Sequence, residues 1–440
     1  MRRVATRFSL PKIAAILALG ALFLTVLGYG GDNFALGPVP IPLVWLLIAL
    51  LTALVGFRGA VLLFRWHPWL FALWLTVLAG GLVRLLVDYG RFGLWAVRSS
   101  VFFVASVGVP VGMYLGWQLR TRSWHRFVVA PALASIVYTL SYPWQESLLD
   151  LSPRSGVFNE VPLLGSYAYF DTATAAVWAG FLGGAAPGLK WGLLIVVTLL
   201  DLAFVQGRLA YLSPLIAGLA VSLVLPRGYR WRVIAWRGVV ATSIIAGSLL
   251  VASVLPIPGR WGNFQATLLL TQLKTIWGEE GPGQGSIEHR RTEYPVAIRN
   301  LLDAPVATLV AGEGLGTPIE LGVTGIYIRR LHLDYVEVIY RTGAVGILWI
   351  LLVIGLWWTV LSRIKLAIGK KLISAHNRIA ALMVCGILTI SLVRATHQPL
   401  FFWAYGAFPF FFYSGLALGV TRGLEQNQCA RHQEYPAVPR

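Results

Sequence analysis

Long apolar runs, separated by short polar or basic segments, dominate the pattern of this sequence. A helix of about 20 apolar residues crosses the hydrocarbon core of a bilayer, and each run is close to that length. The runs lie near residues 13–30, 41–57, 68–87, 97–117, 127–143, 172–188, 191–206, 209–226, 238–256, 343–361, 379–396 and 400–420. The pattern therefore predicts an all-α polytopic membrane protein with about twelve spanning helices. Residues 1–440 are interpreted as a single integral membrane domain, with a solvated tail from Glu425.

Composition excludes a soluble protein, since 57% of the residues are hydrophobic and 12% are charged, against about 25% charged in soluble domains. The net charge of +18 would suggest nucleic acid in a soluble protein. Here it is divided between the two membrane faces. With a cytoplasmic N-terminus, most Lys and Arg residues fall on the inside and the short outside loops are poor in them, as the positive-inside rule requires. Both termini are predicted to be cytoplasmic, and no nucleic-acid partner is expected.

The chain ends and the cysteines change this picture little. The basic N-terminus resembles a signal peptide, but no small-x-small cleavage site follows Leu27, so a retained first helix is predicted. Cys385 and Cys429 lie in no metal-ligand spacing. Neither a disulfide nor a zinc site is expected.

Two outside segments, 144–171 and 257–333, are too long and polar to be simple turns. Loops of this length usually carry function. The second is rich in glycine and charge at 278–294 and 311–316, with a helix predicted over 292–302. It is the best candidate for a cap over an active site.

A histidine stands where this long segment meets the next predicted span. Ten residues separate His332 from Gly343, with Glu337 between them and Gly346 after them. This arrangement resembles the signature of bacterial O-antigen ligases and Wzy-type polysaccharide polymerases. The alternative is an interfacial histidine followed by a packing glycine.

Arginines in two other stretches follow the order of the same family. Arg208 lies between two predicted spans on the outside, where the family has an arginine at the head of a helix; alternatively it is a surface arginine that snorkels. Arg290 and Arg291, with Tyr294, resemble the family's arginine followed by an aromatic residue. Tryptophan is the commoner residue there, and either arginine fits.

A last stretch resembles the family's loop that ends in proline and a Gly-x-Gly turn. It runs from Arg299 to Pro305 and is followed by Gly312, Gly314 and Gly316, with extra residues between the two parts. The chain departs from the family after the histidine, where Leu333 replaces a frequent asparagine. Asp334 could supply the missing hydrogen bond.

The resemblance implies a GT-C-like fold, with 257–333 and 144–171 as periplasmic loops, and a donor glycan linked through a diphosphate to undecaprenol. Arginine forks can bind diphosphate oxygens and stabilise the charge of the departing group, which assigns this role to Arg208, Arg290 and Arg291. A histidine accepts a proton readily near neutral pH, which makes His332 the general base for the attacking hydroxyl. Neither outside loop contains a D-x-D pair, so metal-independent transfer without a cofactor is predicted. Direct attack from the face opposite the diphosphate would invert the anomeric centre.

Other charged residues are given a structural interpretation first. Arg84, Asp88, Arg91 and Arg98 cluster near the outer ends of two predicted spans, and structural pairing is favoured over lining a path for the lipid diphosphate. Ten residues separate Arg154 from Gly165. This spacing resembles the paired arginine-to-glycine motifs of such polymerases and favours a polymerase slightly, although chance explains it equally well.

Two further candidates lie at the outer end of the span at 379–396. Arg394 and His397 are costly near lipid unless they face the interior. For each of these two residues, a place in the lining of the site and a purely structural role are equally favoured. Glu337, Arg299, Arg154 and Arg394 are thus the supporting candidates.

The favoured function is polymerisation of undecaprenyl-diphosphate-linked repeat units of an exopolysaccharide or O-antigen at the outer face of a bacterial inner membrane. Transfer of the glycan to lipid A-core by an O-antigen ligase is the alternative. A transporter of lipid-linked oligosaccharides is the rival from another class, disfavoured because the polar residues gather at one surface. A structural scaffold would leave the His332 motif unexplained. The expected partners are the lipid-linked donor, a glycan or lipid A-core acceptor, membrane lipids, and chain-length regulators or export proteins.

Overall fold

The computed structural model describes most of the chain. The described residues are 9–35, 41–119, 122–155, 161–165, 170–183, 189–205, 208–226, 235–240, isolated positions between 243 and 293, 295–320, 327–328, 331, 333–396 and 398–434.

Helices account for nearly all of the described secondary structure. They are α1 (Leu10–Val26), α2 (Gly28–Asn33), α3 (Leu43–Leu51), η1 (Thr52–Gly56), α4 (Phe57–Trp66), α5 (Pro68–Phe92), α6 (Leu94–Ser99), α7 (Val101–Val104), η2 (Ala105–Val107), α8 (Gly108–Leu119), α9 (Arg122–Trp124), η3 (His125–Val129), α10 (Ala130–Thr139), η4 (Tyr142–Trp144), α11 (Gln145–Leu151), α12 (Phe170–Gly183), α13 (Leu189–Val205), α14 (Arg208–Val224), α18 (Val306–Ala311), α19 (Asp334–Thr342), α20 (Ala344–Gly369), α21 (Ala375–Arg394) and α22 (Ala404–Glu434). Residues 295–302 are also helical. Two antiparallel strand pairs join β1 (Arg154–Ser155) to β2 (Val161–Pro162) and β3 (Ile319–Glu320) to β4 (Tyr327–Ile328).

The protein is a helical membrane protein. Among the described residues, five helical stretches are long and apolar enough to cross a membrane: 43–66, 68–92, 101–119, 344–369 and 377–394. A sixth is added if the pair 125–139 and 142–151, bent by 54°, is one span. The helices α1, α13 and α14 are apolar but shorter.

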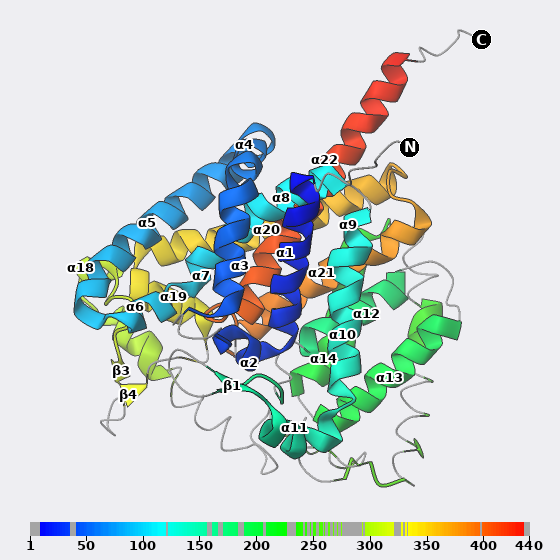
Figure 1. Cartoon of the computed structure of the whole chain (residues 1–440), viewed down its shortest axis with the longest axis horizontal. Helices are drawn as coiled ribbons and strands as arrows, with labels where there is room; N and C mark the ends of the chain where they lie inside the picture. Colours follow the sequence, from blue (N-terminus) through cyan, green and yellow to red (C-terminus); the bar gives the residue numbers. More distant parts are fainter. Residues whose placement is uncertain are drawn as a thin grey trace, which may run out of the picture.

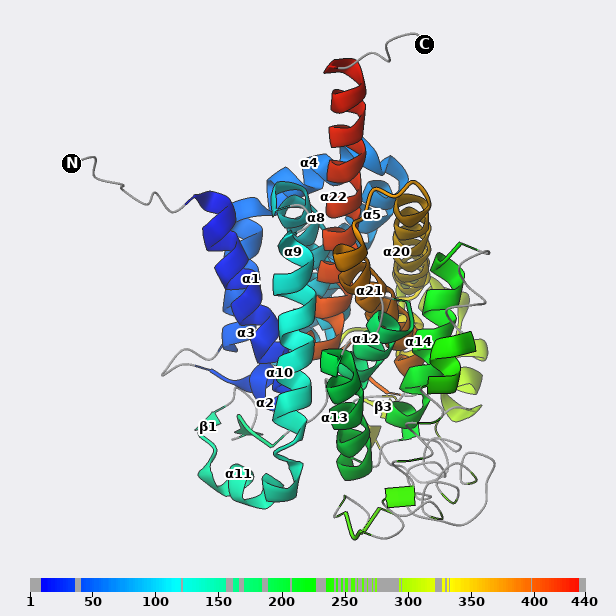
Figure 2. The same cartoon turned by 90° about the vertical axis from the view of Figure 1, so that its right-hand side faces the viewer.

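The bundle has two distinct ends. The start of α1 and the end of α22 lie at the same end (Figures 1 and 2). The short elements α2, α11, β1 and β3 lie at the opposite end, which we call the outer end, after the predicted topology. Both long outside segments of the sequence therefore contribute elements to one end of the bundle.

Two helices run past the ends of the apolar runs that predicted them. Helix α5 continues to Phe92, beyond the predicted end at 87, and Arg84 pairs with Asp88 one turn further on. Helix α22 continues to Glu434, although a solvated tail was predicted from Glu425. Glu425 pairs with both Arg363 of α20 and Arg422 of its own helix.

Glycine brings α8 and α22 together at the centre of the bundle. A Cβ atom at Gly112 of α8 would collide with the carbonyl of Phe412, and one at Gly415 of α22 would collide with the carbonyl of Val109. Gly116 and Gly419 repeat this close approach one turn further along. Small residues at every fourth position let two membrane helices approach backbone to backbone. The α8–α22 contact is therefore set by the absence of side chains.

Aromatic packing connects this centre to the outer end. Trp349 of α20 donates its indole N–H to the carbonyl of Phe102, and its ring packs edge-on against Phe102 and Phe401. Phe401 belongs to the connection between α21 and α22, residues 395–403. The aromatic core thus anchors this connection through Phe401.

Candidate functional site

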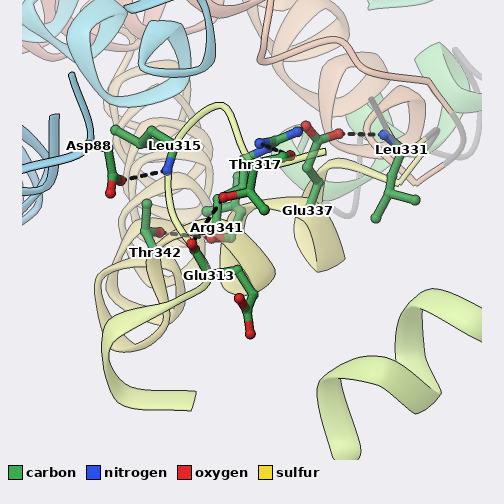
Figure 3. A network of polar contacts seen from close by, with 9 residues as sticks. Asp88, Glu313, Leu315, Thr317, Leu331, Glu337, Arg341 and Thr342 are labelled. Carbon is green, nitrogen blue, oxygen red and sulfur yellow. Dashed lines mark hydrogen bonds and ion pairs between the residues drawn. The ribbon is translucent and has the colours of Figure 1, made fainter. Parts of the chain in front are cut away.

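Glu337 joins helix α19 to the residue before position 332 at the outer end of the molecule (Figure 3). It lies on α19 and is fully buried. One carboxylate oxygen accepts the backbone N–H of Leu331 at 2.7 Å, and the other accepts the guanidinium Nε of Arg341 at 2.7 Å. Because both partners are donors, the carboxylate is stabilised in place despite its burial. Glu337 therefore holds the backbone next to position 332.

Arg341 extends this network to a glycine-rich loop, residues 312–317. Its side chain is completely buried, and Nη1 donates to the carbonyl of Thr317 at 3.0 Å. The loop also binds the end of α19 through its backbone, since the N–H groups of Glu313 and Gly314 donate to the carbonyls of Tyr340 and Arg341. The Glu313 carboxylate points away from the Glu337–Arg341 pair (Figure 3).

Gly314 shows why this loop needs glycine. Its φ of 120° is a backbone conformation that L side chains rarely adopt. A Cβ atom there would lie 2.9 Å from Arg84 Nη2. Asp88 closes the loop on this side, because its Oδ2 accepts the N–H of Leu315 at 2.6 Å. The same oxygen accepts Arg84 Nε at 2.6 Å. Arg84 and Asp88 therefore form a pair, as the structural interpretation predicts.

Asp334 fixes the chain on the other side of position 332. It is fully buried at the start of α19, and its carboxylate accepts the N–H of Phe401 at 2.7 Å. Its own N–H donates to the carbonyl of Ala395 at 3.0 Å. Buried carboxylates therefore hold the backbone through Leu331 on one side of His332 and through Asp334 on the other.

Arg394 lies at the end of α21, where the connection 395–403 begins. It is 5% exposed, and its Nε donates to Gln398 Oε1 at 2.6 Å. Its Nη1 lies 3.8 Å from Asp171 Oδ2, and its guanidinium lies 5.9 Å from the ring centroid of Tyr405. Burial raises the pKa of Asp171, and the positive charge of Arg394 opposes that rise.

Asp32 adds a second buried carboxyl to this region. It lies in α2, and the backbone N–H groups of Ala404 and Tyr405 donate to it. Burial outweighs these hydrogen bonds and raises the pKa of Asp32 to about 8. Burial therefore favours the protonated form of this carboxyl group at the outer end.

An alternating set of cations and aromatic rings lines the same connection. The guanidinium of Arg98 lies 5.2 Å from the ring of Trp95 and 4.8 Å from the ring of Trp403. Trp403 is stacked with Tyr405 at an interplanar angle of 11°. Arg98 therefore packs on aromatic rings, whereas Arg84 pairs with a carboxylate.

The structure links two of the predicted site residues indirectly. Asp334, one turn before Glu337 on α19, donates its N–H to Ala395, the residue after Arg394. Arg154 at the start of β1 and Arg299 in the helix at 295–302 are exposed, and neither contacts this network within the described part of the chain. Arg208 begins α14, but its side chain lies outside what the structure describes. His332, Arg290, Arg291 and His397 lie outside the described residues.

Sequence reasoning missed three residues of this region. Arg341 stands four residues after Glu337 on one helix, a spacing typical of ion pairs, and could have been found. Asp171, paired with Arg394, lies far from it in the sequence. Asp32 also lacked a signal, because its contacts come from the far end of the chain.

Within the described residues, no three His, Cys, Asp or Glu side chains gather in a way that could hold a metal ion. No protein-family model matches the chain, and no curated protein is similar to it in sequence.

Proposed function

We propose that this protein is a glycosyltransferase that polymerises glycan repeat units carried on undecaprenyl diphosphate. The transfer takes place at the outer face of a bacterial inner membrane, without a metal ion and with inversion of the anomeric centre. The polypeptide carries about twelve spans of the GT-C-like kind, with 257–333 over the site. The proposal is motivated by the residues from 206 to 346 that resemble the ligase and polymerase family.

One observation carries the proposal: buried carboxylates hold the backbone on both sides of His332. Glu337 binds the N–H of Leu331, and Asp334 joins the chain to Phe401. A general base must be held within hydrogen-bond reach of the hydroxyl it deprotonates, and rigid flanks reduce the loss of entropy in reaching that geometry. In this mechanism His332 accepts the proton of the acceptor hydroxyl while that oxygen attacks the anomeric carbon.

The departing diphosphate needs positive charge in the same mechanism. Arg208 and Arg290 or Arg291 bind its oxygens, and the leaving negative charge is stabilised as it develops. Arg394 supports the site from the side of α21, where it is buried against Gln398 and Asp171. It is a positioning residue because it holds the connection 395–403 that Asp334 also contacts.

The test gives the purified protein in lipid nanodiscs an undecaprenyl-diphosphate-linked repeat unit, with and without lipid A-core. Longer lipid-linked glycans are the expected product. Product on lipid A-core alone would assign ligation instead, and no product with either acceptor would contradict the proposal. Activity should persist in EDTA, and restoration by added magnesium after a loss would contradict metal independence.

His332→Ala should slow transfer about 100-fold to 10,000-fold while the donor still binds, as expected for a lost general base. Arg208→Ala should instead weaken donor binding, with Lys only a partial replacement because it lacks the planar fork. The matched control is Arg58→Ala, an exposed arginine of α4 that belongs to no candidate site. Wild-type transfer by a well-folded His332→Ala protein would remove the base from the mechanism.

A further inference from the structure

Asp201 is a buried carboxyl group in an apolar helix. It lies in α13, one turn before the helix ends at Val205, and it is 0% exposed. Neither of its oxygens has a hydrogen-bond partner among the residues that the structure describes. Unmade hydrogen bonds of a buried group destabilise a protein. Acidic residues inside membrane helices are rare and usually serve a ligand or a proton.

Tyr211 places a second unpaired group beside the same hairpin. It lies in the first turn of α14, and its buried hydroxyl also has no partner within the described residues. Its ring packs against the clusters that contain Leu202 and Ala203, the two residues that follow Asp201. Two oxygen-bearing side chains thus lie at one end of the α13–α14 hairpin without a hydrogen-bond partner among the described residues.

This end of the hairpin adjoins the candidate site. Leu202 packs with Phe170 at the start of α12. The next residue, Asp171, lies 3.8 Å from Arg394, and its carbonyl accepts the hydroxyl of Ser213 from α14 at 3.4 Å. The unpaired groups and the connection 395–403 are therefore joined through the start of α12.

The chemistry of these two groups selects among ligands. Neither group carries the positive charge that attracts a diphosphate, and the described residues offer no set of three side chains for a metal ion. A carboxyl oxygen and a phenol accept hydrogen bonds from hydroxyl groups, and the phenol can also donate. We propose that Asp201 and Tyr211 bind the hydroxyl groups of the sugar next to the diphosphate in the lipid-linked donor. This inference rests on the proposed function, in which Arg208, between these two residues in the sequence, binds the diphosphate.

The test compares two lipids, undecaprenyl diphosphate with and without its glycan, on protein in nanodiscs. Binding and thermal unfolding are measured for wild type, Asp201→Leu, Asp201→Asn and Tyr211→Phe. The matched control is Thr198→Val, which changes a buried residue of the same helix whose hydroxyl already donates to Leu194. Asp201→Leu should weaken binding of the glycan lipid by about 10-fold to 100-fold. Binding of the sugar-free lipid should be unchanged.

Stability without ligand provides the second readout. If Asp201 served packing alone, its replacement would lower the unfolding temperature. Asp201→Leu should instead unfold at the wild-type temperature or above it, because the substitution removes an unpaired carboxyl group. The inference is overturned if Asp201→Leu binds the glycan lipid like wild type, if it loses both lipids equally, or if wild type does not distinguish them. Asp201-dependent binding without transfer would defeat the proposed function and leave the sugar site standing. Glycan transfer by Asp201→Leu with unchanged lipid binding and KM would defeat the sugar site and leave the proposed function standing.

Discussion

Two buried regions of the molecule are packed in opposite ways. The first is the contact between α8 and α22, and the second is the network around α19. At the first, glycines such as Gly112 and Gly415 remove side chains, so that backbone touches backbone. At the second, Glu337 and Arg341 are charged side chains that are completely buried. Glycine needs no partner, whereas a buried charge needs a donor or acceptor for each polar atom. The first region is a scaffold, and the second holds backbone segments at chosen positions.

The largest expected effect comes from breaking the buried ion pair. Glu337→Ala leaves Arg341 buried without its carboxylate, and loss of one partner of a buried pair costs about 3–5 kcal/mol of unfolding free energy. SDS-titrated unfolding of the purified protein measures this cost. A loss below about 1 kcal/mol, the range of exposed pairs, would show that the pair contributes little.

The double variant Glu337→Leu with Arg341→Met sharpens the comparison. Apolar replacement of both partners often restores stability, so unfolding should return close to wild type. Glycan transfer should stay low, because Leu331 still lacks the acceptor for its N–H. Recovery of both stability and transfer would mean that the network does not position the chain beside His332.

A smaller effect is expected at the helix contact. Gly415→Ala places a Cβ atom against the carbonyl of Val109, and overpacking of this kind costs about 1–3 kcal/mol. Gly192→Ala in α13 is the matched control, since a Cβ atom there meets nothing within 4 Å, and alanine should stabilise that helix by about 0.5–1 kcal/mol. Equal unfolding free energies for the two variants would contradict the backbone contact of α8 and α22.

The smallest effect, when taken over one pH unit, concerns the pH dependence of stability. Burial raises the pKa of Asp32 from 3.8 to about 8, so the folded state keeps a proton that the unfolded state releases. Its contribution is fully present below about pH 4 and is lost as the pH rises toward 8, by at most about 1.4 kcal/mol per pH unit. Asp32→Asn should flatten this part of the unfolding profile. An identical pH slope in the variant would mean that Asp32 is ionised in the folded protein.

Much of the helical architecture could be predicted from local pattern alone. The runs at 68–87 and 343–361 correspond to α5 and α20 because an apolar stretch in a membrane has to satisfy its backbone internally. The run at 97–117 is divided among α6, α7, η2 and α8. That division was not visible in hydropathy, which records where a chain is apolar and not where its helix changes geometry.

In the candidate site too, local relations could be predicted from the sequence and long-range contacts could not. Glu337 was predicted as a supporting residue from its place beside His332, and a partner four residues away on one helix is a local relation. The contacts of Asp334 with Phe401 and of Asp171 with Arg394 join residues far apart in the chain. No spacing in a single sequence encodes such pairs.

The sequence by itself determined that the chain is a helical membrane protein, because composition and the length of apolar runs decide how a polypeptide partitions into a bilayer. Only the tertiary structure decided which polar groups share the outer end. Helix packing brought α2, α12, α19 and the connection 395–403 together there. Burial then made each carboxyl depend on its particular donors, and Asp201 stands out because packing buried it without any described partner.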